Sequence, residues 1–174
     1  MDIRYPIGKY NYAGISSSAQ KSEWINDISQ LPMKLHEAIE GLSEDQLDIA
    51  YRDGGWTIRQ VIHHLADSHM NSYMRFKLAL TEDTPTIKPY YEDRWAELED
   101  SLRTDVKISI LLLEALHHRW AILLRSMEEV DYLRQFYHPE SQKKVSLDEN
   151  LGFYAWHGKH HITHITTLRD KLVI

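Results

Sequence analysis

The chain has 174 residues, a length typical of one domain with a sizeable core. Apolar residues make up 43% of the chain and charged residues 26%, which excludes a disordered protein. The net charge of −6 argues against a nucleic-acid-binding protein, which would present a basic face. The absence of cysteine excludes disulfides, Cys-ligated zinc and a thiol nucleophile.

Hydrophobic periodicity predicts a first long helix between Trp24 and Leu42, where apolar residues recur every three or four positions. Pro32 lies inside this segment, so it should kink the helix or open one backbone hydrogen bond. The stretch Ser43–Gln46 has the form of a capping box and predicts a brief extra helical turn.

Three more long helices follow along the chain. The second begins at Thr57, where Gln60 completes a capping box, and its apolar face runs to Leu80. The third extends from about Thr104 to Met127, and the fourth begins at the capping box of Ser146 and Glu149. Its apolar stripe continues to Leu172.

The fold class follows from these four segments, because strand signals are weak everywhere. We predict an all-α protein, an antiparallel four-helix bundle with short extra helices in the connections. Residues 1–174 should form a single domain, with residues 1–16 as an N-terminal arm. The sequence shows no signal segment and no membrane span, so we expect a soluble cytoplasmic protein that binds no membrane.

Histidine is unusually frequent, with 11 residues, and seven of these lie in two short segments. One segment falls on the second predicted helix and the other on the fourth: His63, His64 and His69, then His157, His160, His161 and His164. The fourth helix has two pairs at i, i+4 spacing, and each pair puts two imidazoles on one face within reach of one ion. Neutral imidazole is a ligand for zinc, nickel and iron(II).

Helix phase ranks these histidines. At 100° per residue, His157 and His161 lie nearest the apolar stripe, whereas His160 should face solvent or a partner subunit. A third ligand would come from the second helix, where phase favours His69 and places His64 on the flank. The alternative for a lone core histidine, such as His69 or His117, is a hydrogen-bonded core residue without a ligand role.

Other catalytic motifs are absent. The residue after His157 is glycine, so there is no HExxH motif of a zinc protease. The chain also has no GxSxG elbow and no Gly-rich phosphate loop.

Two stretches carry a family resemblance: YRDGGWTIRQVIHHLADSHMNSY (residues 51–73) and FYAWHGKHHITHI (residues 153–165). Together they resemble the YfiT-like branch of the DinB superfamily. This resemblance implies a four-helix bundle, a homodimer, and one divalent metal ion per subunit held by three histidines. The matching positions are His64 in the HHL element and His157 and His161 in the HxxxH element.

The resemblance also bears on the neighbours of these ligands. His69 then becomes a core residue or a neighbour of the ligands, and three further residues are candidates to surround the site: His160, His164 and Asp67. A carboxylate such as Asp67 could orient a ligand imidazole. Many superfamily members have glutamine where this chain has His164, so this position departs from the family pattern.

Three protein ligands leave coordination positions open, which is typical of catalytic rather than structural zinc. We therefore expect a metal-dependent hydrolase that acts on a small molecule through an activated bound water, with zinc favoured and nickel as the other candidate. One alternative is a metal-dependent S-transferase for a low-molecular-weight thiol of the bacillithiol type. Another is a non-catalytic stress protein whose metal only ties two helices together.

Overall fold

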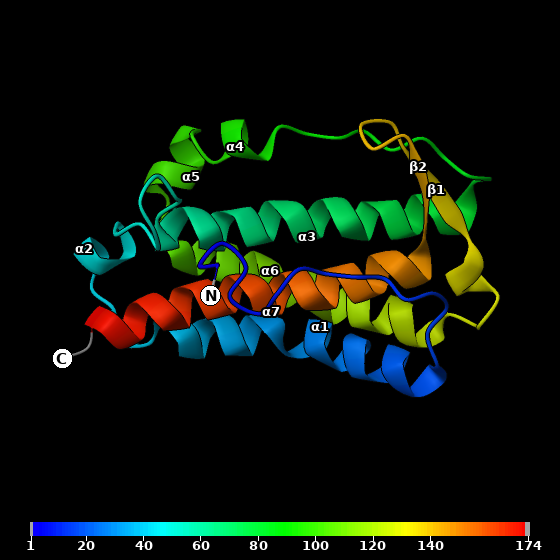
Figure 1. Cartoon of the computed structure of the whole chain (residues 1–174), viewed down its shortest axis with the longest axis horizontal. Coiled ribbons are helices and arrows are strands. Elements are labelled where there is room, and N and C mark those ends of the chain that lie inside the picture. The colour runs from blue at the N-terminus through cyan, green and yellow to red at the C-terminus, as the bar shows by residue number, and fades with distance from the viewer. Residues whose placement is uncertain (1, 173–174) are drawn as a thin grey trace.

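The computed structural model describes residues 2–172, and four long helices form a bundle within this range. They are α1 (Ser18–Ile39), α3 (Ile58–Thr81), α6 (Val106–Ser126) and α7 (Leu147–Leu172). Helices α1 and α7 run in one direction and α3 and α6 in the other (Figure 1). Helix α1 packs against α6 and α7, and α3 packs against the same two. The predicted all-α four-helix bundle is confirmed.

Short helices occupy the connections, as predicted. They are α2 (Glu44–Leu47), α4 (Glu92–Trp95), α5 (Glu99–Arg103) and the 3-10 turn η1 (Asp131–Leu133). The segment from residue 82 to residue 105 returns along the bundle (Figure 1), and this return lets α3 and α6 run parallel. The same segment places α4 beside α3.

The predicted capping residues hold the helix starts. The Thr57 side chain accepts from the Gln60 N–H, and the Gln60 side chain accepts from the Thr57 N–H, which closes the capping box of α3. Ser43 and Gln46 form the same pair at α2. At α7 the hydroxyl of Ser146 accepts from the Glu149 N–H at 3.1 Å. These local contacts fix where α3 and α7 begin.

A small hairpin, β1 (Gln135–His138) and β2 (Lys143–Ser146), was not expected from the sequence. Each strand has four residues, too few to show a clear period of two. Phe136 is buried in the core and pairs with Val145 across the hairpin. Backbone bonds from Ile87 to Tyr137 and from Tyr137 to Pro85 attach the long connection to the hairpin.

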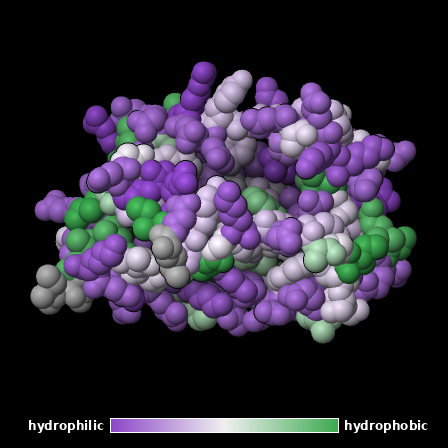
Figure 2. All heavy atoms as spheres, viewed as in Figure 1, coloured by the Kyte–Doolittle hydropathy of each residue, from purple (hydrophilic) through white to green (hydrophobic). Residues whose placement is uncertain are grey.

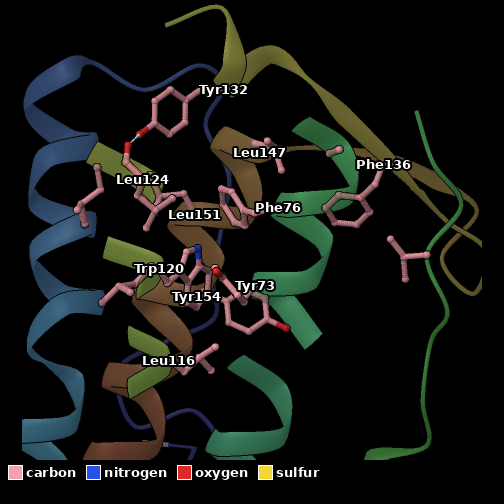
Figure 3. Close-up of a cluster of buried hydrophobic side chains, with 14 residues drawn as sticks. Tyr73, Phe76, Leu116, Trp120, Leu124, Tyr132, Phe136, Leu147, Leu151 and Tyr154 are labelled. Atoms are coloured by element: carbon pink, nitrogen blue, oxygen red, sulfur yellow. Dashed lines mark hydrogen bonds between the residues drawn. The ribbon is translucent and has the colours of Figure 1, made fainter. Parts of the chain in front are cut away.

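The core has an aromatic half and an aliphatic half. In the aromatic half Trp120 is fully buried, and its ring meets Phe76 and Tyr154 edge to face (Figure 3). The aliphatic half lies around the N-terminal part of α3, with Ile62 and Leu65 fully buried. Such close packing gives the histidines between the two halves rigid surroundings.

Helices α1 and α7 approach closely where α7 carries glycine. A Cβ atom on Gly158 would lie 2.7 Å from Cδ1 of Leu31, and one on Gly152 would lie 2.7 Å from the Trp24 ring. Both positions therefore need a residue without a side chain. The close approach brings the backbone of α1 near the histidine-bearing part of α7.

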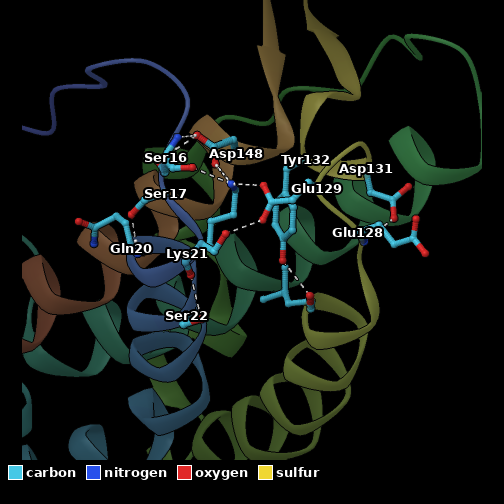
Figure 4. A network of polar contacts seen from close by, with 12 residues as sticks. Ser16, Ser17, Gln20, Lys21, Ser22, Glu128, Glu129, Asp131, Tyr132 and Asp148 are labelled. Carbon is cyan, nitrogen blue, oxygen red and sulfur yellow. Dashed lines mark hydrogen bonds and ion pairs between the residues drawn. The ribbon is translucent and has the colours of Figure 1, made fainter.

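The N-terminal arm, residues 2–16, forms no helix and lies along α7 (Figure 1). A buried polar network anchors its end (Figure 4). The Asp148 carboxylate is fully buried and accepts from the Tyr12 hydroxyl and from the Ser16 N–H and hydroxyl. The buried Lys21 ammonium donates to the Ser16 carbonyl and to Glu129, each at 2.7 Å.

None of the helices within residues 2–172 is both long enough and apolar enough to cross a lipid bilayer.

Candidate metal centre

Three histidines from two helices converge in the bundle. His64 lies near the start of α3, and His157 and His161 lie one turn apart on α7. Their exposed fractions are 5%, 7% and 7%. The Nε2 atoms of His64 and His157 are 3.2 Å apart, and one ring nitrogen from each of the three residues lies within 4.8 Å of the others.

This arrangement suits a transition-metal ion. Zinc–nitrogen bonds of about 2.0–2.1 Å in tetrahedral geometry place two ligand nitrogens roughly 3.3 Å apart. The separation of 3.2 Å between His64 and His157 is close to that value. The three side chains could therefore hold one metal ion with little movement.

Burial keeps the three rings neutral, which is the form that binds metal. Burial lowers the pKa of His64 to about 4. It also lowers the pKa of His157 and of His161 well below the ordinary value, and the neighbouring histidines lower both further. At neutral pH each ring therefore presents a lone pair.

A row of hydrogen bonds fixes the tautomer of His157. His117 Nδ1 lies next to the carbonyl oxygen of Ile28, which can only accept, so this nitrogen carries the proton. The neutral His117 ring then accepts at Nε2 from His69 Nδ1, at 3.0 Å. His69 in turn accepts at Nε2 from His157 Nδ1, at 3.1 Å. The proton of His157 is thereby placed on Nδ1, and its Nε2 lone pair points to the site.

Pro32 supplies the acceptor at the far end of this row. Inside a helix a proline has no N–H for the carbonyl four residues earlier, which here is the carbonyl of Ile28. That carbonyl is free to accept from His117. As expected, Pro32 opens one backbone hydrogen bond. The carbonyl that this leaves free helps to orient the candidate ligand His157.

The three histidines open onto a cleft of about 810 Å³. Trp56 covers one side of the site, and its ring lies 4.6 Å from that of His64. Polar groups of the long connection and of the hairpin line the cleft farther out, among them Tyr90, Glu92 and His138. The face seen in Figure 2 is mostly hydrophilic and is hollowed near its centre. This cleft has the volume of a small-molecule site.

The other predicted site residues fall in three places. His69 is fully buried and contacts the ligand His157 rather than the site itself. The Asp67 carboxylate makes no hydrogen bond to an imidazole among residues 2–172, and burial raises its pKa to about 6. His164 is buried against Tyr51, whose ring stacks on it at 4.1 Å.

The prediction that His160 faces solvent or a partner subunit is wrong. The side chain is only 7% exposed. Trp156 stacks on its ring at 4.6 Å, and Tyr5 of the N-terminal arm lies over it at 6.0 Å. Helix phase predicts burial only within the bundle, and here the arm covers a helix face that would otherwise be exposed.

Phase also misjudged His64, which it placed on the flank of its helix. Helix α7 lies against that flank, so His64 is buried and reaches the site, whereas His69 points into the core. Sequence reasoning missed the ligand-orienting role of His117. Its one signal was Pro32, since a proline inside a helix leaves a carbonyl that needs another donor.

Comparisons with known proteins identify the family of the chain. Residues 27–165 match the family model of the DinB superfamily. The chain is 50% identical to YfiT from Bacillus subtilis, over 99% of this chain and 97% of that one. It is 53% identical to a protein from Bacillus mycoides (strain KBAB4), over 98% of each chain. The names of both relatives propose a metal-dependent hydrolase.

A solved structure of YfiT from Bacillus subtilis, described as an unusual four-helix bundle, superposes with a TM-score of 0.96. The match covers 99% of this chain and 98% of that one, at 50% identity. By family match, relatives and fold, the chain belongs to the DinB superfamily and to its YfiT-like branch.

Proposed function

We propose that this protein is a metal-dependent hydrolase whose ion is held by His64, His157 and His161. The observation that carries the proposal is the 3.2 Å approach of two Nε2 atoms from different helices at the floor of a cleft. The names of the relatives support the same activity. When bound, a divalent ion with open coordination positions supplies a water of lowered pKa as the nucleophile. Zinc is the ion we favour, with nickel second.

Glu92 is the residue we propose as general base. It lines the cleft. Although the residue is exposed, partial desolvation of its carboxylate raises its pKa, and the carboxylates of Asp93 and Glu140 raise it further. A carboxylate with a raised pKa is better suited to take a proton near neutral pH. Glu92→Gln should lower kcat by about 100-fold or more while metal content stays unchanged.

The substrate we propose carries an anionic group. Arg52, Arg75 and Arg94 line the same cleft. None of the three forms an ion pair with a carboxylate in the described part of the chain. Guanidinium groups bind carboxylates and phosphates through paired N–H donors. A carboxylate or phosphate on the substrate would form ion pairs with these guanidinium groups.

The experiment is a hydrolysis screen with metal-depleted protein and with the same protein reloaded with zinc. Esters, amides and phosphate esters are offered in matched pairs, one member anionic and one neutral. We expect turnover only with zinc and a preference for the anionic member, and Arg75→Gln should abolish that preference. Hydrolysis that is equally fast without metal, or that survives His161→Gln, would contradict the proposal.

The S-transferase alternative is tested in the same assay. The chain has no cysteine, so the thiol would have to enter the cleft as a cosubstrate. An electrophilic dye is added with and without bacillithiol or a smaller thiol. Zinc-dependent loss of dye only with thiol, together with a blank hydrolysis screen, would favour transfer over hydrolysis.

A further inference from the structure

A second group of imidazoles lies beside the candidate metal centre, on the side covered by the N-terminal arm. His160, His161 and His164 each offer a ring nitrogen, and the three atoms lie within 4.8 Å of one another. His160 and His164 are one turn apart on α7, with ring centroids 4.3 Å apart. All three side chains are more than nine-tenths buried.

Several nitrogens of this group make no well-formed hydrogen bond, although backbone groups of Ile3 and Arg4 lie within reach of His164. Seven buried side-chain nitrogen or oxygen atoms within residues 2–172 make no hydrogen bond, and four of them belong to these three residues. They are Nδ1 of His160, Nδ1 of His161 and both nitrogens of His164. Buried polar atoms in folded proteins are nearly always satisfied. A concentration of four in one place therefore indicates a missing ligand.

Aromatic rings and the N-terminal arm surround this group at one part of the cleft, which Tyr5, Tyr51, Trp156 and His160 also line. Tyr51 stacks on His164 and Trp156 stacks on His160, so both rings are held in place. Tyr5 lies over His160, and the backbone of Ile3 and Arg4 lies next to His164. No carboxylate of residues 2–172 belongs to the group, so all its donors are imidazole nitrogens. Such donors select zinc, nickel or copper over magnesium and calcium.

We propose that His160, His161 and His164 form a second transition-metal site, which adjoins the first and shares His161 with it. His161 lines the cleft, and its Nδ1 is the buried nitrogen that lacks a partner. Its Nε2 serves the ion of the first site, and Nδ1 serves the second ion after loss of its proton to solvent. The protein then binds two neighbouring ions at the cleft, and Tyr5 of the N-terminal arm lies beside the second.

The experiment measures bound zinc by elemental analysis after equilibrium dialysis of tag-free, metal-depleted protein. We expect two equivalents in the wild type and one in His160→Gln and in His164→Gln. Glutamine fills similar space and forms hydrogen bonds but is a poor ligand for zinc. His36→Gln, on the exposed face of α1, is the matched control and should keep two equivalents.

Further variants separate this proposal from the proposed function. His64→Gln removes the first site only and should leave one equivalent, and His64→Gln/His164→Gln should bind none. If the first site is wrong, His64→Gln will bind as much zinc as the wild type. The number of sites can also be measured in the wild type alone, in case a variant fails to fold. A Co²⁺ titration of the wild type, followed by visible absorption, should saturate after two equivalents.

One equivalent in the wild type, unchanged in His160→Gln and His164→Gln, would overturn the second site. A further result would also overturn the proposal: one equivalent in the wild type, bound with lower affinity in His164→Gln. In that case the group accepts a hydrogen bond from the Nδ1 proton of His161 and binds no metal itself.

Discussion

At the scale of single residues, the proposed metal binding by His157 depends on which of its two nitrogens carries the proton. The row from Ile28 through His117 and His69 places that proton on Nδ1. A ligand histidine usually donates its second N–H to a carbonyl or carboxylate. Here another histidine is the acceptor, and a backbone carbonyl lies at the end of the row.

The role of His69 can be tested with two substitutions of similar size. In His69→Leu the acceptor for His157 Nδ1–H is lost, and we expect zinc affinity to fall by about 10- to 100-fold. In His69→Gln the side-chain oxygen can take the place of Nε2, so most of the affinity should return. Competition with a chromophoric chelator measures both values. Equal affinities in the two variants, after correction for folded fraction, would show that His69 only fills space.

The buried histidines also predict how stability depends on pH in metal-free protein. Burial lowers the pKa of His117 from 6.5 to about 4, and the pKa values of His64 and His160 fall to about 4 as well. Between pH 4 and pH 6.5 these histidines are therefore protonated in the unfolded chain and neutral in the folded chain. Stability should therefore fall as pH falls from 6.5 towards 4, by about 1.4 kcal/mol per pH unit for each such histidine.

Three carboxyl groups act in the opposite direction, because burial raises the pKa of Asp67, Glu92 and Glu149. Burial raises the pKa of Asp67 from 3.8 to about 6, so the folded state takes up this proton first as the pH falls. These three groups are outnumbered by nine histidines whose pKa is lowered, so the net slope keeps its sign. Urea unfolding of metal-free protein at pH 7, 6 and 5 measures the slope. A free energy of unfolding at pH 5 that equals or exceeds the value at pH 7 would contradict the prediction that these histidines stay neutral in the folded protein.

Single residues also show which parts of the site a sequence can reveal. His157 and His161 follow from i, i+4 spacing, because the distance between them is set within one helix. The position of His64 does not follow, because it depends on how α3 and α7 pack against each other. The structure brings His64, which the family resemblance named, together with His157 and His161, whereas helix phase favoured His69.

At the scale of elements, the N-terminal arm is held mainly at Asp148, the second residue of α7. The carboxylate accepts from Tyr12 and Ser16 and lies 3.7 Å from the Lys21 ammonium. We expect Asp148→Ala to lower the free energy of unfolding by about 3 kcal/mol, because it leaves the half-buried donors of Tyr12 and Ser16 without this partner and removes a charge beside the buried Lys21. The arm should also become sensitive to protease before the bundle does.

Urea unfolding and limited proteolysis with mass spectrometry check this prediction. Asp2→Ala is the matched control, since among residues 2–172 its carboxylate pairs only with the exposed Arg4. A variant at Asp148 that is as stable as this control, with an arm as resistant as in the wild type, would show that the network does not hold the arm.

The elements differ in how far the sequence predicts them. The capping residues at Thr57 and Ser146 act within a few positions, so the starts of α3 and α7 could be predicted. The hairpin and the covering of His160 by Tyr5 could not, because both depend on contacts between distant segments. The error at His160 arose because periodicity treats each helix as if only the bundle surrounded it.

At the scale of the whole molecule, one helix face remains apolar and exposed. Four aliphatic side chains on α6 share this face, with exposed fractions between 43% and 59%: Ile108, Leu111, Leu112 and Ile122. A contiguous apolar surface on a helix often marks a subunit interface. The homodimer expected from the family resemblance stays a prediction, and this face is where we place it. Leu111→Glu should sediment as a monomer where the wild type sediments as a dimer, and identical sedimentation would exclude this face.

The central claim is that one ion joins α3 to α7 through His64, His157 and His161. The most direct test is the zinc content of tag-free, zinc-saturated protein in the wild type, His64→Gln, His157→Gln and the double variant. If the two residues hold the same ion, each single variant loses one equivalent and the double variant loses no more than either. Zinc content that is unchanged in a single variant, or losses that add in the double variant, would contradict a shared site.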